Sequence, residues 1–267
     1  MKKKIFISIL ILLIGILCTG FTFPFMEEET EMPRINVEEL ASFEDENIKN
    51  YTLMDLQMKI IEYQNKQNSA HEITQSAKDL GWPENCEPVV MAQIEWRNAK
   101  LIAEYYQKIY EEKLAKIEKE KWDKRMNEYP AATEAWLYMK EQGWNDYVCA
   151  GIMGNLMAET GGQTLNLNPK LYCQGYYGIC QWNKNHKSAV WGKGLTKQLE
   201  YMNSNIKSEI DTYGYAYKKG FKFDTFLNLT DEKEAALAFA KTYERCASST
   251  YEVRQKNATK AYDYFVK

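Results

Sequence analysis

A long stretch without glycine or proline, residues 89–129, constrains the fold of this chain more than any other feature. Met91, Ile94, Ile102 and Ile109 recur in it at helical spacing among many Glu and Lys residues. Because glycine and proline are the usual helix breakers, the stretch predicts one continuous amphipathic helix. At 1.5 Å per residue it would be roughly 60 Å long, more than a compact domain holds. The domain that follows is therefore predicted to begin near Tyr129, just before Pro130.

The N-terminal residues predict export. Lys2, Lys3 and Lys4 precede an apolar run over residues 5–17, and no acidic residue occurs before Glu27. This is the pattern of a secretory signal peptide. The uncharged residues 5–26 are also long enough to serve as a membrane anchor. Residues 1–26 are thus interpreted as a signal peptide or anchor, with the rest of the chain secreted or tethered outside the cytoplasmic membrane.

Residues 27–128 are interpreted as an acidic spacer that contains the long helix. Residues 27–67 are weakly patterned, and we expect them to be largely mobile apart from a short helix at residues 53–63. The apolar stripe of residues 89–128 is narrow. It fits a solvated spacer, a coiled-coil seam, a contact with secretion or conjugation machinery, or packing against the following domain.

The C-terminal part, residues 129–267, predicts a mainly α domain. Amphipathic or apolar helices are expected at residues 131–142, 145–160, 197–210, 231–245 and 249–265. Residues 166–182 break this pattern, because they are rich in glycine and aromatic residues, which indicates a small hairpin. The predicted fold class is therefore mainly α: an α+β domain of several helices with a small hairpin, preceded by the long amphipathic helix.

Charge and metal-binding patterns exclude some functions. Residues 129–267 carry a small excess of Lys and Arg, which favours an anionic polymer but lacks the clustered basic surface of nucleic-acid binding. The two histidines, His71 and His186, are far apart, and no Cys/His group has metal-site spacing. No metal and no cofactor are expected.

Glu159 is the most informative single residue. Cys149, Ile152, Leu156 and Glu159 share one helix face, so the carboxyl group ends an otherwise apolar stripe. Loss of water and the negative end of the helix dipole would both help it to keep a proton near neutral pH. Such a group can protonate a leaving oxygen. The same pattern also fits a glutamate that simply reaches solvent at a helix end.

Three motifs together carry a resemblance. They are Ala-Gly-Ile-Met-Gly-Asn-Leu-Met-Ala-Glu-Thr-Gly at residues 150–161, Asn168-Pro169, and Tyr-Gly-Ile-Cys-Gln-Trp at residues 177–182. This combination resembles the phage-tail-type lysozyme family, one of the lysozyme-like muramidases and lytic transglycosylases. The likeness covers about residues 131–265, with Thr160 where Ser is commoner.

The resemblance implies a lysozyme-like domain that cleaves the β-1,4 glycosidic bonds of bacterial peptidoglycan and acts in the cell wall. Glu159 would be the catalytic acid and base. Glycan-binding positions would be Thr160, Asn168, Tyr177, Gln181 and Trp182. Gly151 and Gly154 would allow close packing against the aromatic hairpin.

The reaction course and two other functions stay open from sequence. No Asp or Glu lies between Glu159 and Glu200, so the usual second carboxylate of a glycoside hydrolase is missing, unless Glu200 or Glu244 approaches from a later helix. This favours a lytic transglycosylase over a hydrolase. The alternatives are a non-catalytic glycan-binding module and, less favoured, a wall endopeptidase that uses Cys149 and His186.

Cysteine usage also leaves alternatives. Export permits disulfides, and the pairs Cys173–Cys180 and Cys149–Cys246 are the first candidates, with free buried thiols as the other possibility.

Overall fold

The structure is a computed structural model that describes residues 47–160 and 162–267. It divides into two compact units, one ending at Glu120 and the other comprising Lys121–Lys267. The predicted signal or anchor at residues 1–26 lies outside the described residues. Within the part that is described, no helix is both long and apolar enough to cross a membrane.

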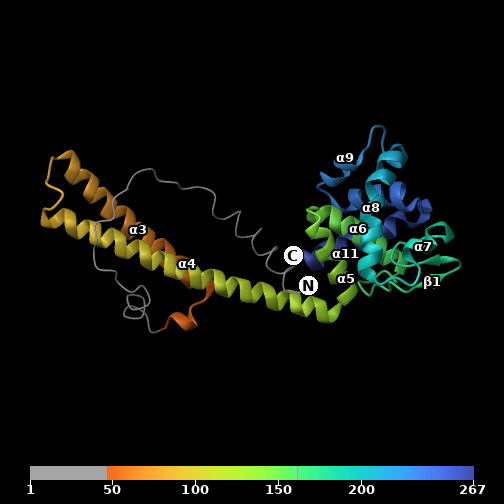
Figure 1. Ribbon diagram of the computed structural model, residues 1–267, viewed down its shortest axis with the longest axis horizontal. Coiled ribbons are helices and arrows are strands. Elements are labelled where there is room, and N and C mark those ends of the chain that lie inside the picture. Colours follow the sequence, from red (N-terminus) through yellow and green to blue (C-terminus); the bar gives the residue numbers. More distant parts are fainter. Residues whose placement is uncertain (1–46, 161) are drawn as a thin grey trace. The chain divides into compact units, whose positions relative to one another are not determined.

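The first unit is a helical hairpin. After the short 3-10 helix η1, Ile48–Asn50, helix α3, Leu53–Asp79, runs antiparallel and side by side with the long α4, Glu87–Glu128 (Figure 1). Thr52 starts α3 with a capping box to Asp55. The predicted long helix is thus confirmed.

The helix predicted at residues 53–63 is confirmed but is longer than expected, and residues 64–67, which were expected to be mobile, belong to it. The reason is the packing of α3 on α4. Buried residues of both helices form one cluster: Leu56, Ile60, Tyr63, Ala99, Ile102, Ala103 and Tyr106. The apolar stripe of α4 is therefore covered by α3 along this part of its length.

The second unit is mainly helical with a two-stranded hairpin, which confirms the predicted fold class. Its main helices are α5 Pro130–Glu141, α6 Asp146–Thr160, α8 Leu195–Tyr213, α10 Glu232–Phe239 and α11 Tyr251–Phe265. Shorter elements are η2 Lys184–His186, α7 Lys187–Val190, η3 Gly214–Ala216, α9 Phe223–Leu227, the π-helical turn η4 Ala240–Glu244 and η5 Ser248–Thr250.

The hairpin consists of β1, Tyr172–Cys173, and β2, Tyr176–Tyr177, paired antiparallel with Tyr172 opposite Tyr177. It lies with α7 at one edge of the second unit (Figure 1). Gly175, between the strands, has φ +92°, which suits a tight turn that other residues rarely adopt. The predicted hairpin within residues 166–182 is confirmed.

Helix α6 is the centre of the second unit. It is buried along almost its whole length, and its most extensive contacts are with α11 and α10. Asn145 accepts a hydrogen bond from the Val148 N–H and caps its start, as the sequence predicts. A helix buried on most sides is expected to be largely apolar, and the buried residues of α6 are so apart from Asn155 in its middle and Thr160 at its end. Glu159 stands in its last turn.

Two glycines let the helices approach α6 closely. A Cβ at Gly151 would lie 2.5 Å from Ala235 Cβ on α10, and one at Gly154 would lie 2.5 Å from the Arg254 carbonyl oxygen on α11. The expectation that they pack against the aromatic hairpin is therefore wrong. The close neighbours of both are helices, because α10 and α11 cross α6 nearer than a side chain on either glycine would permit.

Candidate functional site

Glu159 lies in the last turn of α6, where the buried helix reaches the surface. Its side chain is 17% exposed, whereas Ile152 and Leu156 on the same face are fully buried. The helix thus holds the carboxylate in a fixed place at the rim of the core. Its orientation is set by one strong partner, Arg254 on α11.

Arg254 is a buried cation whose side chain bonds to three residues on two elements, α6 and η5. Its Nη2 donates to the Glu159 carboxylate, its Nη1 to Asn155 Oδ1 at 3.0 Å, and its Nε to Thr250 Oγ1 at 3.2 Å. The Asn155 amide nitrogen in turn donates to the carbonyl oxygens of Gly151 and Ala236. Arg254 is 4% exposed, so its charge depends on carboxylates nearby.

This geometry adds a partner that the sequence pattern does not show. The pattern predicts a carboxyl group that can keep its proton because it loses water and lies at the negative end of the helix dipole. In the structure the group forms an ion pair with Arg254. Arg254, which provides this partner, is buried and lies 95 residues from Glu159 in the sequence.

Glu244 is a second carboxylate that acts on the same arginine. It is the last residue of the π-helical turn η4, and Arg245, with φ 50°, then ends the helix in the left-handed conformation. π-turns within helices are frequent at functional sites. The Glu244 Oε1 atom is shut off from solvent and has no hydrogen-bond partner among the residues that the structure describes.

The surroundings of Glu244 favour its neutral form. Burial raises its pKa, and the charge of Glu159 raises it further, to about 8, although Arg254, a hydrogen bond with the Cys180 thiol and Arg245 oppose this. For Arg254, burial lowers the pKa, but the charges of Glu159 and Glu244 outweigh that effect and raise it. The three side chains therefore form one electrostatic unit.

The segment after the hairpin forms another part of the site. Tyr177 and Trp182 exchange both backbone hydrogen bonds, at 3.0 and 2.9 Å. The Tyr177 ring stacks on Trp191 at 4.9 Å, and the Trp182 ring packs edge-on against Tyr201 at 5.7 Å. Cys180, between them, is close enough to Glu159 and Glu244 for both charges to raise the pKa of its thiol, after the larger effect of burial.

The sequence of the second unit matches a known family. Residues 130–265 fit the family model of the phage tail lysozyme. The chain belongs to the phage tail lysozyme family. Membership implies cleavage of peptidoglycan glycan strands, and hence action in the cell wall. No match was found among curated proteins or among solved structures.

The structure gives the predicted binding residues of the lysozyme domain different local roles. Thr160 is buried, and its hydroxyl donates to the Leu156 carbonyl oxygen. Asn168 accepts from the Lys170 N–H in a tight turn. The Gln181 amide nitrogen donates to the carbonyl oxygens of Leu171 and Gly178. These contacts shape the loops of the lysozyme site, and Tyr177 and Trp182 pack into the same region.

The sequence pattern does not identify three residues that the structure brings to the fore. It indicates no role for Arg254 or Gln198, and it offers Glu244 as one of two possible second carboxylates. A signal for Arg254 exists, because it shares a buried helix stripe with Asn257, Ala258 and Ala261. Glu200, the other candidate, is paired with Lys197 on the surface.

Gln198, fully buried on α8, ties the loops of the site together. Its Oε1 accepts from the Ile179 N–H at 2.8 Å, and its amide nitrogen donates to the carbonyl oxygens of Pro169 and Lys193 at 2.7 and 2.8 Å. Gly178, with φ +82°, lies against this side chain, because a Cβ there would be 2.3 Å from Gln198 Oε1. One amide thus fixes three segments.

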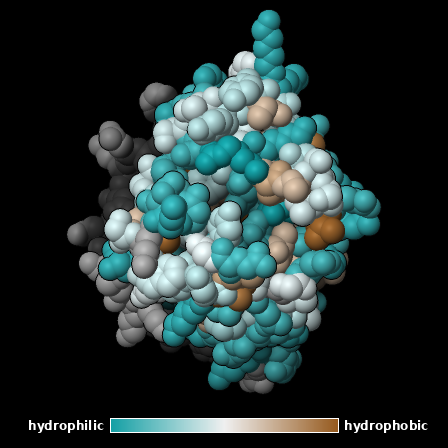
Figure 2. Space-filling view, turned by 90° about the vertical axis from the view of Figure 1, so that its right-hand side faces the viewer, coloured by the Kyte–Doolittle hydropathy of each residue, from teal (hydrophilic) through white to brown (hydrophobic). Residues whose placement is uncertain are grey.

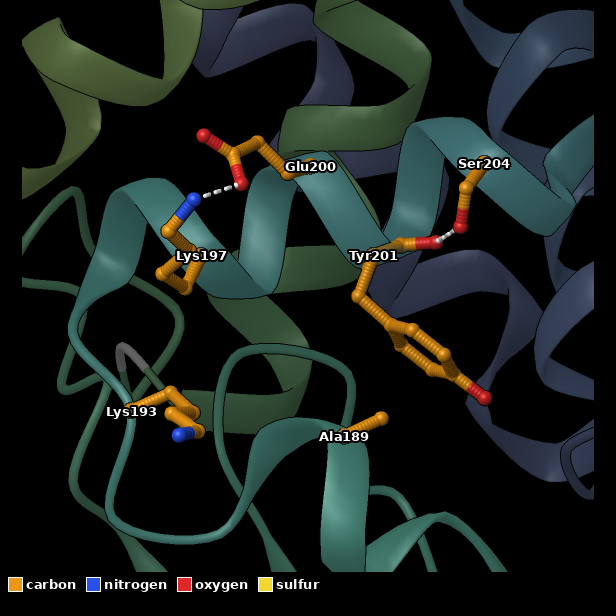
Figure 3. Close-up of a pocket in the computed structure, with 6 residues that line it drawn as sticks. All are labelled: Ala189, Lys193, Lys197, Glu200, Tyr201 and Ser204. Atoms are coloured by element: carbon orange, nitrogen blue, oxygen red, sulfur yellow. Dashed lines mark hydrogen bonds and ion pairs between the residues drawn. The ribbon is translucent and has the colours of Figure 1, made fainter.

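A shallow groove lies beside Tyr201 on α8. It has a volume of about 360 Å³ and is lined by Ala189, Lys193, Lys197, Glu200, Tyr201 and Ser204. The Tyr201 ring points from α8 toward Ala189 on α7 (Figure 3), and its hydroxyl lies 2.7 Å from His186 Nδ1. Figure 2 shows one face of the molecule as mainly hydrophilic, with only separate apolar residues. Such a surface suits a polar polymer.

Of the two alternatives for the cysteines, the structure has free thiols and neither candidate disulfide. Cys149, Cys173, Cys180 and Cys246 are all unpaired. The thiol of Cys173 on β1 is exposed, whereas the thiol of Cys180 is buried. Among the described residues, no group of three or more His, Cys, Asp or Glu side chains could hold a metal ion.

Cys149 is a poor nucleophile, which argues against the endopeptidase alternative. Burial raises the pKa of its thiol to about 12, and a thiol must ionise to attack. His186 bonds to Tyr201 rather than serving Cys149.

Proposed function

We propose that the phage tail lysozyme domain cleaves the β-1,4 glycosidic bonds of peptidoglycan with Glu159 as acid and then base. The observation that carries this proposal is the position of Glu159: the only acidic side chain in the second half of a buried helix, held by Arg254 at the rim of the core. Tyr177, Gln181 and Trp182, with Thr160 and Asn168, are proposed to form or shape the glycan-binding surface.

We further propose the anhydro route of a lytic transglycosylase over hydrolysis. Hydrolysis normally uses a second carboxylate that activates water or attacks the sugar, and otherwise side-chain amides such as those of Gln174 and Gln181 must hold the water. Glu244 is the neighbouring carboxylate, yet its Oε1 is closed to solvent and its raised pKa keeps it neutral. With one working carboxylate, Glu159 would protonate the leaving oxygen and then accept the proton of the muramyl 6-hydroxyl, which closes the 1,6-anhydro ring.

The test is Glu159→Gln in the full chain, because the amide keeps the shape but cannot transfer a proton. We expect turbidity loss of purified peptidoglycan to fall by about 10²-fold or more. Glu252→Gln, on the exposed start of α11, is the matched control and should cut like the wild type. If Glu159→Gln still cuts, Glu159 is a structural partner of Arg254 and the domain works otherwise.

Mass spectrometry of the released muropeptides separates the two routes. Products with anhydro ends support the transglycosylase. Reducing ends, heavier by one water, would instead make the enzyme a hydrolase.

The organisation of the whole chain is also a proposal. Residues 1–26 are proposed to export the protein and to be removed or retained as an anchor, and residues 27–128 to act as a spacer. The contact of residues 89–128 with secretion or conjugation machinery likewise stays a proposal, supported only by the exposed residues Met91 and Ile117 on α4.

A further inference from the structure

The aromatic rings that solvent reaches near the hairpin are not the ones that the sequence indicates. Tyr177 and Trp182, the aromatic residues predicted to bind glycan, are each only 7% exposed. Trp191, directly after α7, and Tyr172, on β1, are 41% and 57% exposed. A ligand at this edge of the second unit would therefore meet a different pair of rings.

The two exposed rings form one cluster with Tyr177. The register of the hairpin places Tyr172 opposite Tyr177, so both side chains leave the same face of the two strands. The Trp191 ring stacks on Tyr177 with the ring centroids 4.9 Å apart, and it meets Tyr172 edge to face at 5.1 Å. Tyr177 thus supports one face of the indole, while the rest of the indole is partly open to solvent beside Tyr172.

The segments that carry these rings are fixed to each other by backbone and side-chain hydrogen bonds. The Lys193 N–H donates to the Val190 carbonyl oxygen at 3.0 Å, which closes the turn that contains Trp191. The Lys193 carbonyl oxygen accepts from Gln198, and the same amide accepts from the Ile179 N–H just after the hairpin. Because one buried side chain holds both segments, a ligand would find the rings already in place.

The size of this surface indicates a small ligand. Even a whole aromatic side chain offers only about 150–250 Å². Two rings that are already partly buried therefore fall well short of the roughly 800 Å² that a stable protein interface buries on each partner. A second copy of the chain or another folded protein is thus a poor occupant.

The surroundings of the two rings indicate a polar ligand with an apolar face. Their exposed neighbours along the chain include Gln174 and Lys193, and Lys193 also lines the groove beside Tyr201. A sugar ring fits such a surface, because its C–H groups can lie on the electron-rich face of an aromatic ring while its hydroxyl and amide groups keep polar partners.

We propose that Trp191 and Tyr172, here called the aromatic pair, bind a sugar ring of a β-1,4-linked N-acetylated glycan strand. The identity of the strand rests on the proposed function. Tyr177 lies beneath the pair and supports it, rather than contacting the sugar. The aromatic pair transfers no proton, so it acts on the affinity for the strand and leaves the chemical step to Glu159.

The first test measures binding without cleavage. The full chain with Glu159→Gln, the parent, is titrated in a calorimeter with chitotetraose, the tetramer of β-1,4-linked N-acetylglucosamine. Addition of Trp191→Ala should weaken binding about tenfold or more, and addition of Tyr172→Ala about two- to fivefold, because each removes one stacking contact. Trp191→Phe keeps a ring on Tyr177 and should keep most of the affinity.

Two other exposed aromatic residues serve as matched controls. Tyr176 lies on the same hairpin as Tyr172 but on its opposite face, and it is 49% exposed. Trp82, in the first unit, is 47% exposed and matches Trp191. Tyr176→Ala and Trp82→Ala should bind the tetramer like the parent. In NMR spectra the indole N–H signal of Trp191 should shift on titration, whereas that of Trp82 should stay.

The outcomes of the binding test decide on the aromatic pair. Equal affinity of the parent and Trp191→Ala, or no binding of the tetramer by the parent, would overturn the proposal. So would a Trp191→Ala chain that changes its sedimentation and not its affinity, since the pair would then be a contact between copies. Thermal unfolding checks the fold of each variant, and where Trp191→Ala does not fold, Tyr172→Ala against Tyr176→Ala decides.

The cleavage assay separates the aromatic pair from the proposed function. With Glu159 intact, Trp191→Ala should raise KM for peptidoglycan and change kcat little, because it removes binding that substrate and transition state share. An unchanged KM in Trp191→Ala, together with lost cleavage in Glu159→Gln, contradicts the aromatic pair alone. A wild type that binds the tetramer through Trp191 but does not cut contradicts the proposed function alone.

Discussion

At the scale of the residue, Glu244 is expected to lower stability at neutral and alkaline pH. Its pKa is raised from 4.5 to about 8 in the folded protein, so the folded state holds a proton that the unfolded state has lost. The free energy of unfolding therefore decreases as pH rises from 4.5 to about 8. Below pH 4.5 Glu244 carries its proton in both the folded and the unfolded state, so it adds nothing to the pH dependence of stability.

Glu244→Gln should consequently unfold at a higher temperature than the wild type at the alkaline end of this window, and the gain should shrink toward its acid end. Calorimetry across the window measures it. A gain that is the same at every pH would show that packing, not titration, causes it.

The two glycines of α6 give a second prediction at this scale. Gly154→Ala improves helix propensity by about 1 kcal/mol, but its Cβ would lie 2.6 Å from the Ala258 backbone nitrogen. Overpacking typically costs about 1–3 kcal/mol, and here the contact is with backbone, which cannot turn aside. We expect a net loss of unfolding free energy in urea titrations. Gly194→Ala, at the N-cap of α8, is the control: the added atom has no neighbour within 4 Å, so its loss should be limited to the weaker capping by Ala.

At the scale of the element, Gln198 of α8 is expected to hold the hairpin in its active shape. Gln198→Leu leaves the Ile179 N–H and the Pro169 and Lys193 carbonyl oxygens without their partner, at about 1–3 kcal/mol for each group that stays buried. We expect cleavage to fall about tenfold or more, since small misplacements in a site are costly. Amide exchange at Ile179 should become faster while α6 stays protected.

The control for this element is Gln255→Leu, which removes a single exposed hydrogen bond to the Lys233 carbonyl oxygen. It should leave cleavage and the exchange of Ile179 unchanged. Equal exchange at Ile179 in Gln198→Leu and the wild type would mean that the strand pairing alone orders the segment.

Several elements could be predicted because their signals are local. The apolar spacing of Cys149, Ile152 and Leu156 gives α6, and glycines among aromatic residues give the hairpin. The second half of α3 has no such signal, because only the small residues Ala70 and Ala77 are buried there.

The electrostatic unit of the site could not be predicted for a different reason. Glu159 and Arg254 meet across 95 positions of sequence, and only the close crossing of α11 on α6 at Gly154 brings them together. A sequence pattern reports which face of a helix is apolar, but not which charge will approach its end.

At the scale of the whole molecule, the last turns of α4 are expected to belong to the lysozyme domain. The sequence pattern predicts that residues 129–267 fold and cut alone. In the structure the second unit begins at Lys121. Arg125 is 6% exposed, and its Nη2 donates to the Tyr264 carbonyl oxygen at 2.7 Å. The Trp122 ring stacks on Phe265 at 6.3 Å.

A fragment of residues 121–267 should therefore melt higher than one of residues 129–267. Loss of a buried hydrogen-bonded cation and a stacked aromatic pair is worth about 2–3 kcal/mol. At roughly 2–4 °C per kcal/mol, the melting temperature of the shorter fragment should be about 4–12 °C lower. A fragment of residues 113–267 adds two further turns outside the unit and should gain nothing more. Equal melting temperatures for all three would place the boundary at Tyr129, whereas a further gain from residues 113–120 would make the spacer helix part of the folded domain.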